Sequence, residues 1–197
     1  MKMKKQYTKN IFLILIRKIL KTQKNKKEFI FKVIDILGIT SKYDFKSKDE
    51  MKQQYIAGYL FEKITAFQIY NEIKDNSKVI GMEASLKTFK DGITHSIDEL
   101  DIVLLTNTGK IINFECKSGG MSGDNAKSHN YTTYRLNGVF GMPILLSPLY
   151  KNEKEDKINK NFLESAFEAR RSAKRAELKT ICINEIQEEI KNLLGVL

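Results

Sequence analysis

"DELDIVLLTNTGKIINFECKSGG", residues 98–120, is the stretch that decides the fold. Its apolar run over residues 102–105 is typical of a buried strand, residues 106–110 contain the turn signal Thr-Gly, and residues 110–116 have the pattern of a second strand. The stretch therefore predicts a β-hairpin. Because side chains alternate between the two faces of a strand, we expect Glu115 and Lys117 on one face and Phe114 and Cys116 on the other.

The charged residues of this hairpin need a reason. Asp101, Glu115 and Lys117 lie inside or at the ends of its two apolar runs. A charge on a buried strand is costly unless it is paired or holds a metal ion. Two interpretations follow: a metal site built from the two acids with a lysine beside it, or a structural ion pair between Lys117 and one carboxylate. The ion pair alone leaves the acidic set unexplained.

Composition limits the class of protein. A chain of 197 residues with 42% hydrophobic residues can bury a full core, which predicts a soluble globular domain with extensions. The 34 Lys and Arg residues outnumber the 24 Asp and Glu residues, and the formal charge of +10 favours nucleic acid or, less specifically, an anionic membrane surface as partner. The only cysteines, Cys116 and Cys182, are far apart, so we expect neither a disulfide framework nor a structural zinc site. We therefore expect the protein to reside in a reducing cytoplasm.

The N-terminal segment does not have the pattern of a targeting signal. The apolar run "IFLILI" at residues 11–16 follows several lysines but is interrupted by Arg17 and Lys18. A membrane-spanning helix needs about 20 apolar residues, and no small-residue cleavage site follows the run. We predict a basic amphipathic helix that packs on the core or contacts nucleic acid or a membrane surface. Residues 1–50 are interpreted as a basic helical extension with a linker, and residues 51–197 as one compact domain.

The rest of the chain alternates between helical and strand patterns. We predict a helix that carries Glu62 and packs Tyr59, Leu60, Ile64, Phe67 and Ile73 on a sheet. A strand, the hairpin and further helices and strands follow. The predicted ranges are helix 56–73, strand 78–86, hairpin 98–117, helix 128–139, strand 142–147, helix 152–178, strand 179–184 and helix 185–194. The order is α-β-β-β-α-β-α-β-α, an α/β fold.

This order, with Glu62 on the first helix, Asp101 on a strand and "ECK" at residues 115–117, resembles the PD-(D/E)xK nuclease superfamily. The motifs "DELD" (98–101), "FECKSG" (114–119) and "YRLNGVFGMPILLS" (134–147) are most similar to the nuclease half of CRISPR-associated effectors, in which a cyclic-oligoadenylate sensor precedes the nuclease. Asp98 stands where that family has Asn. The 50 residues ahead of the domain are too few for such a sensor, so we expect no cyclic-oligonucleotide sensor in this chain.

The resemblance implies a restriction-endonuclease-like core, a mixed sheet flanked by helices, and a nuclease that depends on Mg²⁺ or Mn²⁺. Asp101, Glu115 and the backbone carbonyl of Cys116 would hold the ion, because hard divalent cations prefer oxygen ligands. Lys117 would stabilise the charge that develops on the phosphate and orient or deprotonate the attacking water. Glu62 would act as an additional ligand, or would tether a water, a second ion or Lys117.

The predicted activity is hydrolysis of phosphodiester bonds in DNA, or alternatively RNA, in defence against mobile elements or in repair. A homodimer follows by analogy with nucleases that cut two strands. The alternative function is a non-catalytic nucleic-acid-binding module that keeps the nuclease fold. Weaker candidates are residues 118–124 as a lip over the phosphate, His129 as a substrate contact and Glu99 as a support for a ligand. A basic set on the long helix either contacts phosphates or is a solvated face: Arg170, Arg171, Lys174 and Arg175.

Overall fold

The computed structural model describes residues 53–195 except residues 93 and 156, so the predicted extension over residues 1–50 lies outside the described residues. The predicted order of helices and strands is confirmed, with one added turn of 3₁₀ helix. The elements are α3 (Gln53–Ile73), β1 (Val79–Thr88), β2 (Asp98–Thr106), β3 (Ile111–Cys116), α4 (Gly123–Asn137), η2 (Gly138–Phe140), β4 (Gly141–Ser147), α5 (Lys157–Arg175), β5 (Lys179–Cys182) and α6 (Ile186–Gly195).

The five strands form one mixed sheet in the order β1-β2-β3-β4-β5. The predicted hairpin pairs β2 with β3 in antiparallel fashion, and β1 joins β2 in the same way. Strands β4 and β5 extend the sheet in parallel from β3, through the connecting helices α4 and α5. Strand β3, which carries Glu115 and Cys116 and is followed directly by Lys117, is therefore the middle strand of the sheet.

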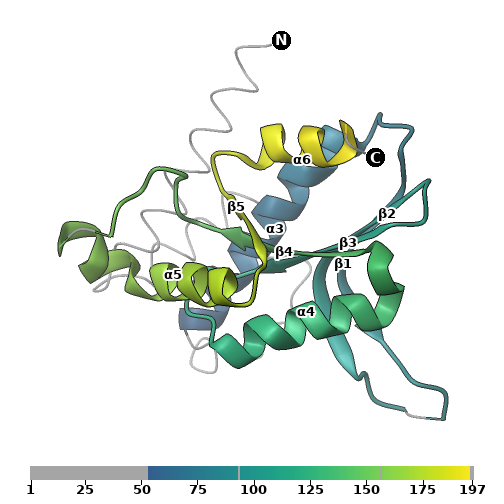
Figure 1. Cartoon of the computed structure of the whole chain (residues 1–197), viewed down its shortest axis with the longest axis horizontal. Coiled ribbons are helices and arrows are strands. Elements are labelled where there is room, and N and C mark those ends of the chain that lie inside the picture. The colour runs from purple at the N-terminus through teal and green to yellow at the C-terminus, as the bar shows by residue number, and fades with distance from the viewer. Residues whose placement is uncertain (1–52, 93, 156, 196–197) are drawn as a thin grey trace.

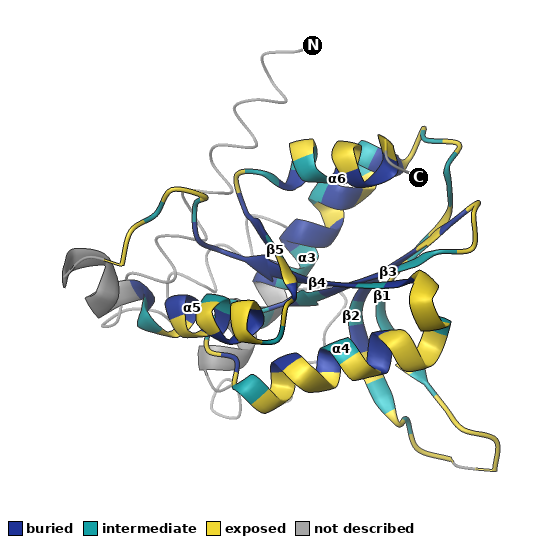
Figure 2. Cartoon of the chain, in the orientation of Figure 1, coloured by how far each residue is buried: buried dark blue, intermediate teal, exposed yellow. Residues whose placement is uncertain are grey.

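Helices cover both faces of the sheet (Figure 1). Helices α3 and α6 pack on one face through the main apolar cluster, which includes Phe61, Ile69, Phe114 and Ile190. Helices α4 and α5 cover the other face around a smaller cluster that includes Leu145 and Ala169. Figure 2 shows the buried residues concentrated in the sheet and on the inner sides of these helices. Two layers of helix thus exclude water from the middle strands.

Helix α3 differs in detail from its prediction. The sequence pattern places Phe67 on the packed face, but this residue is 59% exposed. Ile64 and Ile73 are buried as predicted, and Phe61 and Ile69 complete the packed face. Phe67 lies on the opposite side of the helix at 100° per residue. The side chains of Tyr59 and Leu60, the other two predicted contacts, lie outside the described part of the chain.

Helix α4 begins five residues earlier than predicted, at Gly123 instead of residue 128. Ser122 caps it, because its Oγ accepts a hydrogen bond of 3.1 Å from the backbone nitrogen of Asn125. At its far end the helix lies tightly on β4: a Cβ atom on Gly141 would come within 2.7 Å of the backbone oxygen of Thr133. Helix α5 is shorter than predicted, with 19 residues. None of the helices in the described part of the chain is long and apolar enough to cross a membrane.

Candidate active site

Strand β3 sorts its residues between the two faces as predicted. Phe114 and Cys116 belong to the cluster under α3 and α6, and the Cys116 Sγ lies 3.4 Å from the Thr65 Oγ1 of α3. Glu115 and Lys117 point to the α4 side, where the Lys117 Nζ lies 2.5 Å from the Glu115 Oε1. Period-two alternation in a middle strand is enough to place an acid and a base together on one face.

Asp101 joins this pair from the neighbouring strand. The register pairs Ile102 with Phe114, and continuing it by one residue sets Asp101 opposite Glu115. The Asp101 Oδ2 accepts a hydrogen bond of 2.7 Å from the backbone nitrogen of Cys116. Burial, and then the charge of Glu115, raise the pKa of Asp101 from 3.8 to about 7, although the hydrogen bond from Cys116 and the charge of Lys117 oppose the rise. Burial beside a second acid therefore favours the protonated, neutral form of Asp101.

Lys117 is a cation in this arrangement. Burial lowers its pKa, but the charge and hydrogen bond of Glu115 and then the charge of Asp101 raise it, and the net result is a pKa above the ordinary value of 10.5. A protonated lysine can neutralise negative charge on a phosphate. A lysine that stays protonated is a poor base.

Glu62 approaches the site from α3. Its Oε1 accepts hydrogen bonds from the Ser85 Oγ of β1, at 2.8 Å, and from the Lys63 Nζ, at 3.1 Å. Its charge contributes to the raised pKa of Asp101, by less than the charge of Glu115 does. Of the predicted partners of Glu62, Lys117 pairs with Glu115 instead. Glu62 is thus an acid near Asp101 whose position is fixed by Ser85 and Lys63.

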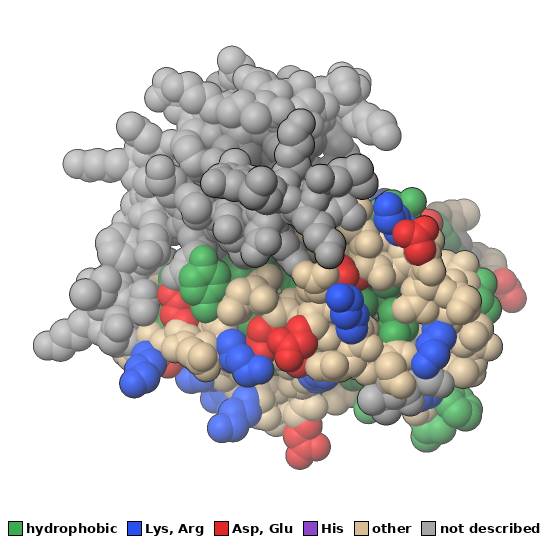
Figure 3. All heavy atoms as spheres, turned by 90° about the horizontal axis from the view of Figure 1, so that it is seen from above, with side chains coloured by type: hydrophobic (Ala, Val, Ile, Leu, Met, Phe, Trp, Pro, Cys, Tyr) green, Lys and Arg blue, Asp and Glu red, His purple; other side chains and the backbone are tan. Residues whose placement is uncertain are grey.

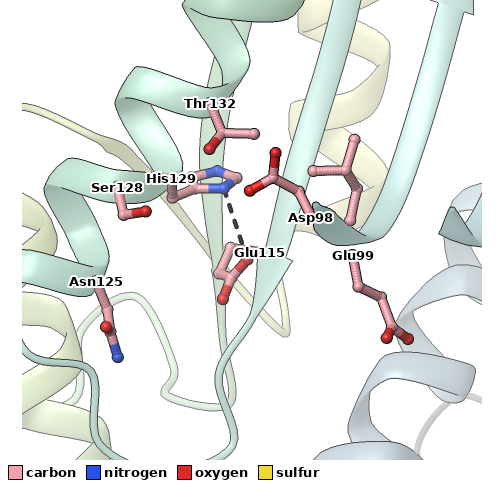
Figure 4. Close-up of a pocket in the computed structure, with 8 residues that line it drawn as sticks. Asp98, Glu99, Glu115, Asn125, Ser128, His129 and Thr132 are labelled. Atoms are coloured by element: carbon pink, nitrogen blue, oxygen red, sulfur yellow. Dashed lines mark ion pairs between the residues drawn. The ribbon is translucent and has the colours of Figure 1, made fainter. Parts of the chain in front are cut away.

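A small polar pocket opens beside Glu115 on the α4 side (Figure 4). Its volume is about 170 Å³. In Figure 4 the Asp98 carboxylate points toward His129 and Glu115, whereas the Glu99 carboxylate points away from them. Glu99, predicted as a support for a ligand, therefore does not contribute to this side of the site. Asp98 also pairs with Arg135 of α4. The lining residues are Asp98, Glu99, Leu100, Glu115, Asn125, Ser128, His129 and Thr132.

His129 also lines this pocket, and its burial was not predicted from the sequence. It is only 7% exposed, its Nδ1 lies 3.6 Å from the Glu115 Oε2, and its buried Nε2 has no hydrogen-bond partner among the described residues. The 3.6 Å separation is too long for a hydrogen bond. Burial lowers the pKa of His129, which the charge of Glu115 opposes. The available signal was the helical spacing of Ala126, His129 and Thr133, which becomes visible once α4 begins at Gly123.

The basic residues of α5 are not equivalent. Arg171 forms ion pairs with Glu155 and Glu164, so its charge is largely compensated. Arg170 lies over the Phe167 ring, 5.1 Å from its centre, and its Nη2 donates to the backbone oxygen of Glu153 at 3.2 Å. Lys174 and Arg175 are exposed. In residues 118–124, the predicted lip, Met121 is buried among α4 and α5, which anchors the middle of the segment.

The residues predicted to hold a metal ion offer oxygen atoms, the ligands that hard divalent cations prefer. No group of three or more His, Cys, Asp and Glu side chains in the described chain is placed to hold a metal ion. Asp101, Glu115 and the Cys116 carbonyl offer oxygen ligands only, and Mg²⁺ commonly takes one or two carboxylates and fills its other positions with water and phosphate oxygens. A cation would also relieve the repulsion that raises the pKa of Asp101.

Two solved structures share this fold. Can2 from Sulfobacillus thermosulfidooxidans, in complex with cyclic tetra-adenylate, matches with a TM-score of 0.51 and 15% identity over 97% of this chain and 50% of the Can2 chain. VC1899 from Vibrio cholerae matches with a TM-score of 0.54 and 13% identity over 96% of this chain and 52% of its own. The chain thus spans about half the length of each. No protein-family model and no curated protein matches the sequence. The likeness shows that this chain shares the α/β fold of these two structures, a mixed sheet flanked by helices.

Proposed function

We propose that the protein is a divalent-metal-dependent nuclease that hydrolyses phosphodiester bonds of DNA at Asp101, Glu115 and Lys117. The observation that carries this proposal is the acid pair on the neighbouring strands β2 and β3: the register continues to set Asp101 opposite Glu115, and burial, then the charge of Glu115, raise the pKa of Asp101 to about 7. A partly buried acid pair of this kind destabilises a fold. Its presence therefore indicates that a cation or a reaction requires it.

Each residue of the set has a separate task in this proposal. Asp101, Glu115 and the Cys116 carbonyl would hold Mg²⁺ or Mn²⁺, which supplies Lewis acidity toward phosphate and water when it is bound. Lys117 places its charge 2.5 Å from Glu115, where it can stabilise negative charge on the phosphate oxygens. Glu62, near enough to influence Asp101, would orient water or a further ion at the same site.

The substrate and the biological context rest on charge and on the family resemblance. The formal charge of +10 favours a polyanion, and the "DELD" and "FECKSG" motifs resemble those of CRISPR-associated nucleases. We therefore propose that the substrate is DNA rather than RNA and that the active form is a homodimer. The proposed role is defence against mobile elements, or repair. A non-catalytic binding module would use the same charge but would have no need for the acid pair.

The test is cleavage of labelled single- and double-stranded DNA and RNA with Mg²⁺, Mn²⁺ or EDTA. We expect cleavage with Mn²⁺ and none with EDTA. Asp101→Asn and Glu115→Gln should each abolish cleavage and leave the fold nearly intact, because removing a ligand removes metal binding and not the core. Glu83→Gln, which changes an exposed acid of β1, is the matched control and should cleave normally. Near wild-type turnover by either site variant would disprove the metal site, and binding without cleavage under every ion would favour the non-catalytic module.

A further inference from the structure

Ser85 has an unusual backbone conformation for a residue inside a strand. Its φ is 57°, in the left-handed region, although it lies within β1. This conformation is unfavourable for a residue with a side chain. The other non-glycine residue with positive φ in the described chain is Glu177, just past the end of α5, where a left-handed residue is common. Ser85 therefore needs an explanation that Glu177 does not.

The position of Ser85 in the sheet supplies a reason. Strand β1 pairs with β2 through Ala84 and Ile102 on one side and through Leu86 and Leu100 on the other, which sets Ser85 opposite Asp101. The Ser85 Oγ donates a hydrogen bond of 2.8 Å to the Glu62 Oε1. The Lys63 Nζ donates to both, at 3.2 Å to the Ser85 Oγ and at 3.1 Å to the Glu62 Oε1. The side chain of the strained residue thus belongs to a closed hydrogen-bond network with Glu62 and Lys63.

We infer that Ser85 is a positioning residue of the active site, which acts through Glu62. Its left-handed backbone directs the hydroxyl toward α3, and the hydroxyl holds the Glu62 carboxylate beside Ser85, which lies opposite Asp101 in the sheet. Strain that persists next to acidic residues of a site is typical of functional positions. The inference rests on the proposed function, because Glu62 must take part in metal binding or catalysis for its position to matter.

Two substitutions separate positioning from a purely structural hydrogen bond. Ser85→Ala removes the hydroxyl and keeps the strain, whereas Ser85→Gly removes both, because glycine adopts positive φ freely. We expect Ser85→Gly to melt at a higher temperature than Ser85→Ala, while single-turnover cleavage with Mn²⁺ falls in both by a similar factor, about 10- to 100-fold. Glu177→Gly is the matched control: it relieves the same strain away from the site and should leave the cleavage rate unchanged.

A second measurement does not depend on cleavage. The Mn²⁺ concentration that gives half of the maximal melting shift is measured for the unsubstituted protein, Ser85→Ala, Glu62→Gln and the double variant. If Ser85 acts through Glu62, both single changes weaken Mn²⁺ binding and the double variant is no weaker than Glu62→Gln alone. Additive effects of the two changes on Mn²⁺ binding would overturn the inference, and so would a cleavage rate that changes in step with the melting temperature across the Ser85 variants. Neither result would affect the proposed function, which Asp101→Asn tests separately. A complete lack of any Mn²⁺ effect on the unsubstituted protein would overturn both.

Discussion

The destabilisation that the site imposes on the fold can be measured at Asp101. The folded protein holds this carboxyl with a pKa of about 7, against an ordinary value of 3.8, because of burial and the neighbouring Glu115. The folded state therefore keeps a proton that the unfolded chain has already released at intermediate pH. By linkage, the contribution of this group to the free energy of unfolding decreases as the pH rises from about 4 to about 7 and is constant above that range.

Replacing Asp101 with Asn should remove this pH dependence. The amide oxygen can still accept the hydrogen bond from the Cys116 backbone nitrogen, but no charge is buried. We expect Asp101→Asn to be more stable than the unsubstituted protein at about pH 8 in EDTA, by on the order of 1–3 kcal/mol, and nearly equal at about pH 4. Urea unfolding at several pH values measures the difference. Equal slopes in both proteins would mean that Asp101 titrates normally.

Strand β3 shows what a single element contributes. Its alternation places Glu115 and Lys117 in the site and turns the Cys116 thiol to Thr65 on the opposite face. Burial, and then the charge of Asp101, raise the pKa of that thiol well above its ordinary value, so it remains protonated. Only the backbone carbonyl of Cys116 is available to the proposed metal site.

Cys116→Ala should therefore keep its activity. We expect a loss of about 1–2 kcal/mol in stability from the small cavity left under α3, and a cleavage rate per folded molecule within about threefold of the unsubstituted protein. Glu115→Gln, one residue away, should abolish cleavage without the cavity cost. Parallel melting and single-turnover assays provide the comparison, and a large loss of rate in Cys116→Ala would show that its thiol takes part in the chemistry.

The same elements show how far sequence reasoning reaches. The hairpin was predictable because two apolar runs flank a Thr-Gly turn, and the placement of Glu115 and Lys117 followed from period two alone. The start of α4 was missed because Gly119, Gly120 and Ser122 favour turns, and the capping role of Ser122 depends on the tertiary path of the chain. With the helix start misplaced, the burial of His129 could not be predicted. The strain at Ser85 has no sequence signature.

At the scale of the whole molecule, the surplus of positive charge is unevenly available to a partner. The formal charge of +10 predicts binding that is largely non-specific and weakens as salt rises. Arg171 of α5 forms ion pairs with Glu164 of the same helix and with Glu155, which precedes it. Lys174 and Arg175 are therefore the residues of the predicted basic set with the most accessible charge. Figure 3 shows lysines, arginines and acids interspersed on the part of the face seen from above that is not grey, so charge there is mixed.

The salt dependence of nucleic-acid binding tests this surface. Replacing Arg170, Arg171, Lys174 and Arg175 with Ala should flatten the plot of log affinity against log salt, by about 0.9 for each phosphate that the variant no longer neutralises. Lys174→Ala and Arg175→Ala should account for most of the change, and Arg171→Ala for little. Lys191→Ala, a change of one exposed charge on α6, is the control and should leave the slope unaltered. A slope that does not respond to these four residues would place the binding surface elsewhere.

The central claim, a metal-dependent nuclease in which Lys117 serves chemistry and the carboxylates serve metal binding, is tested most directly by Lys117→Ala. Single-turnover cleavage and the Mn²⁺-induced melting shift are measured on the same preparation. The predicted result is complete loss of cleavage with the melting shift retained, because Asp101 and Glu115 still repel each other and still gain from the ion. Lower stability with cleavage per folded molecule preserved would contradict the claim and would reduce Lys117 to the structural partner of Glu115.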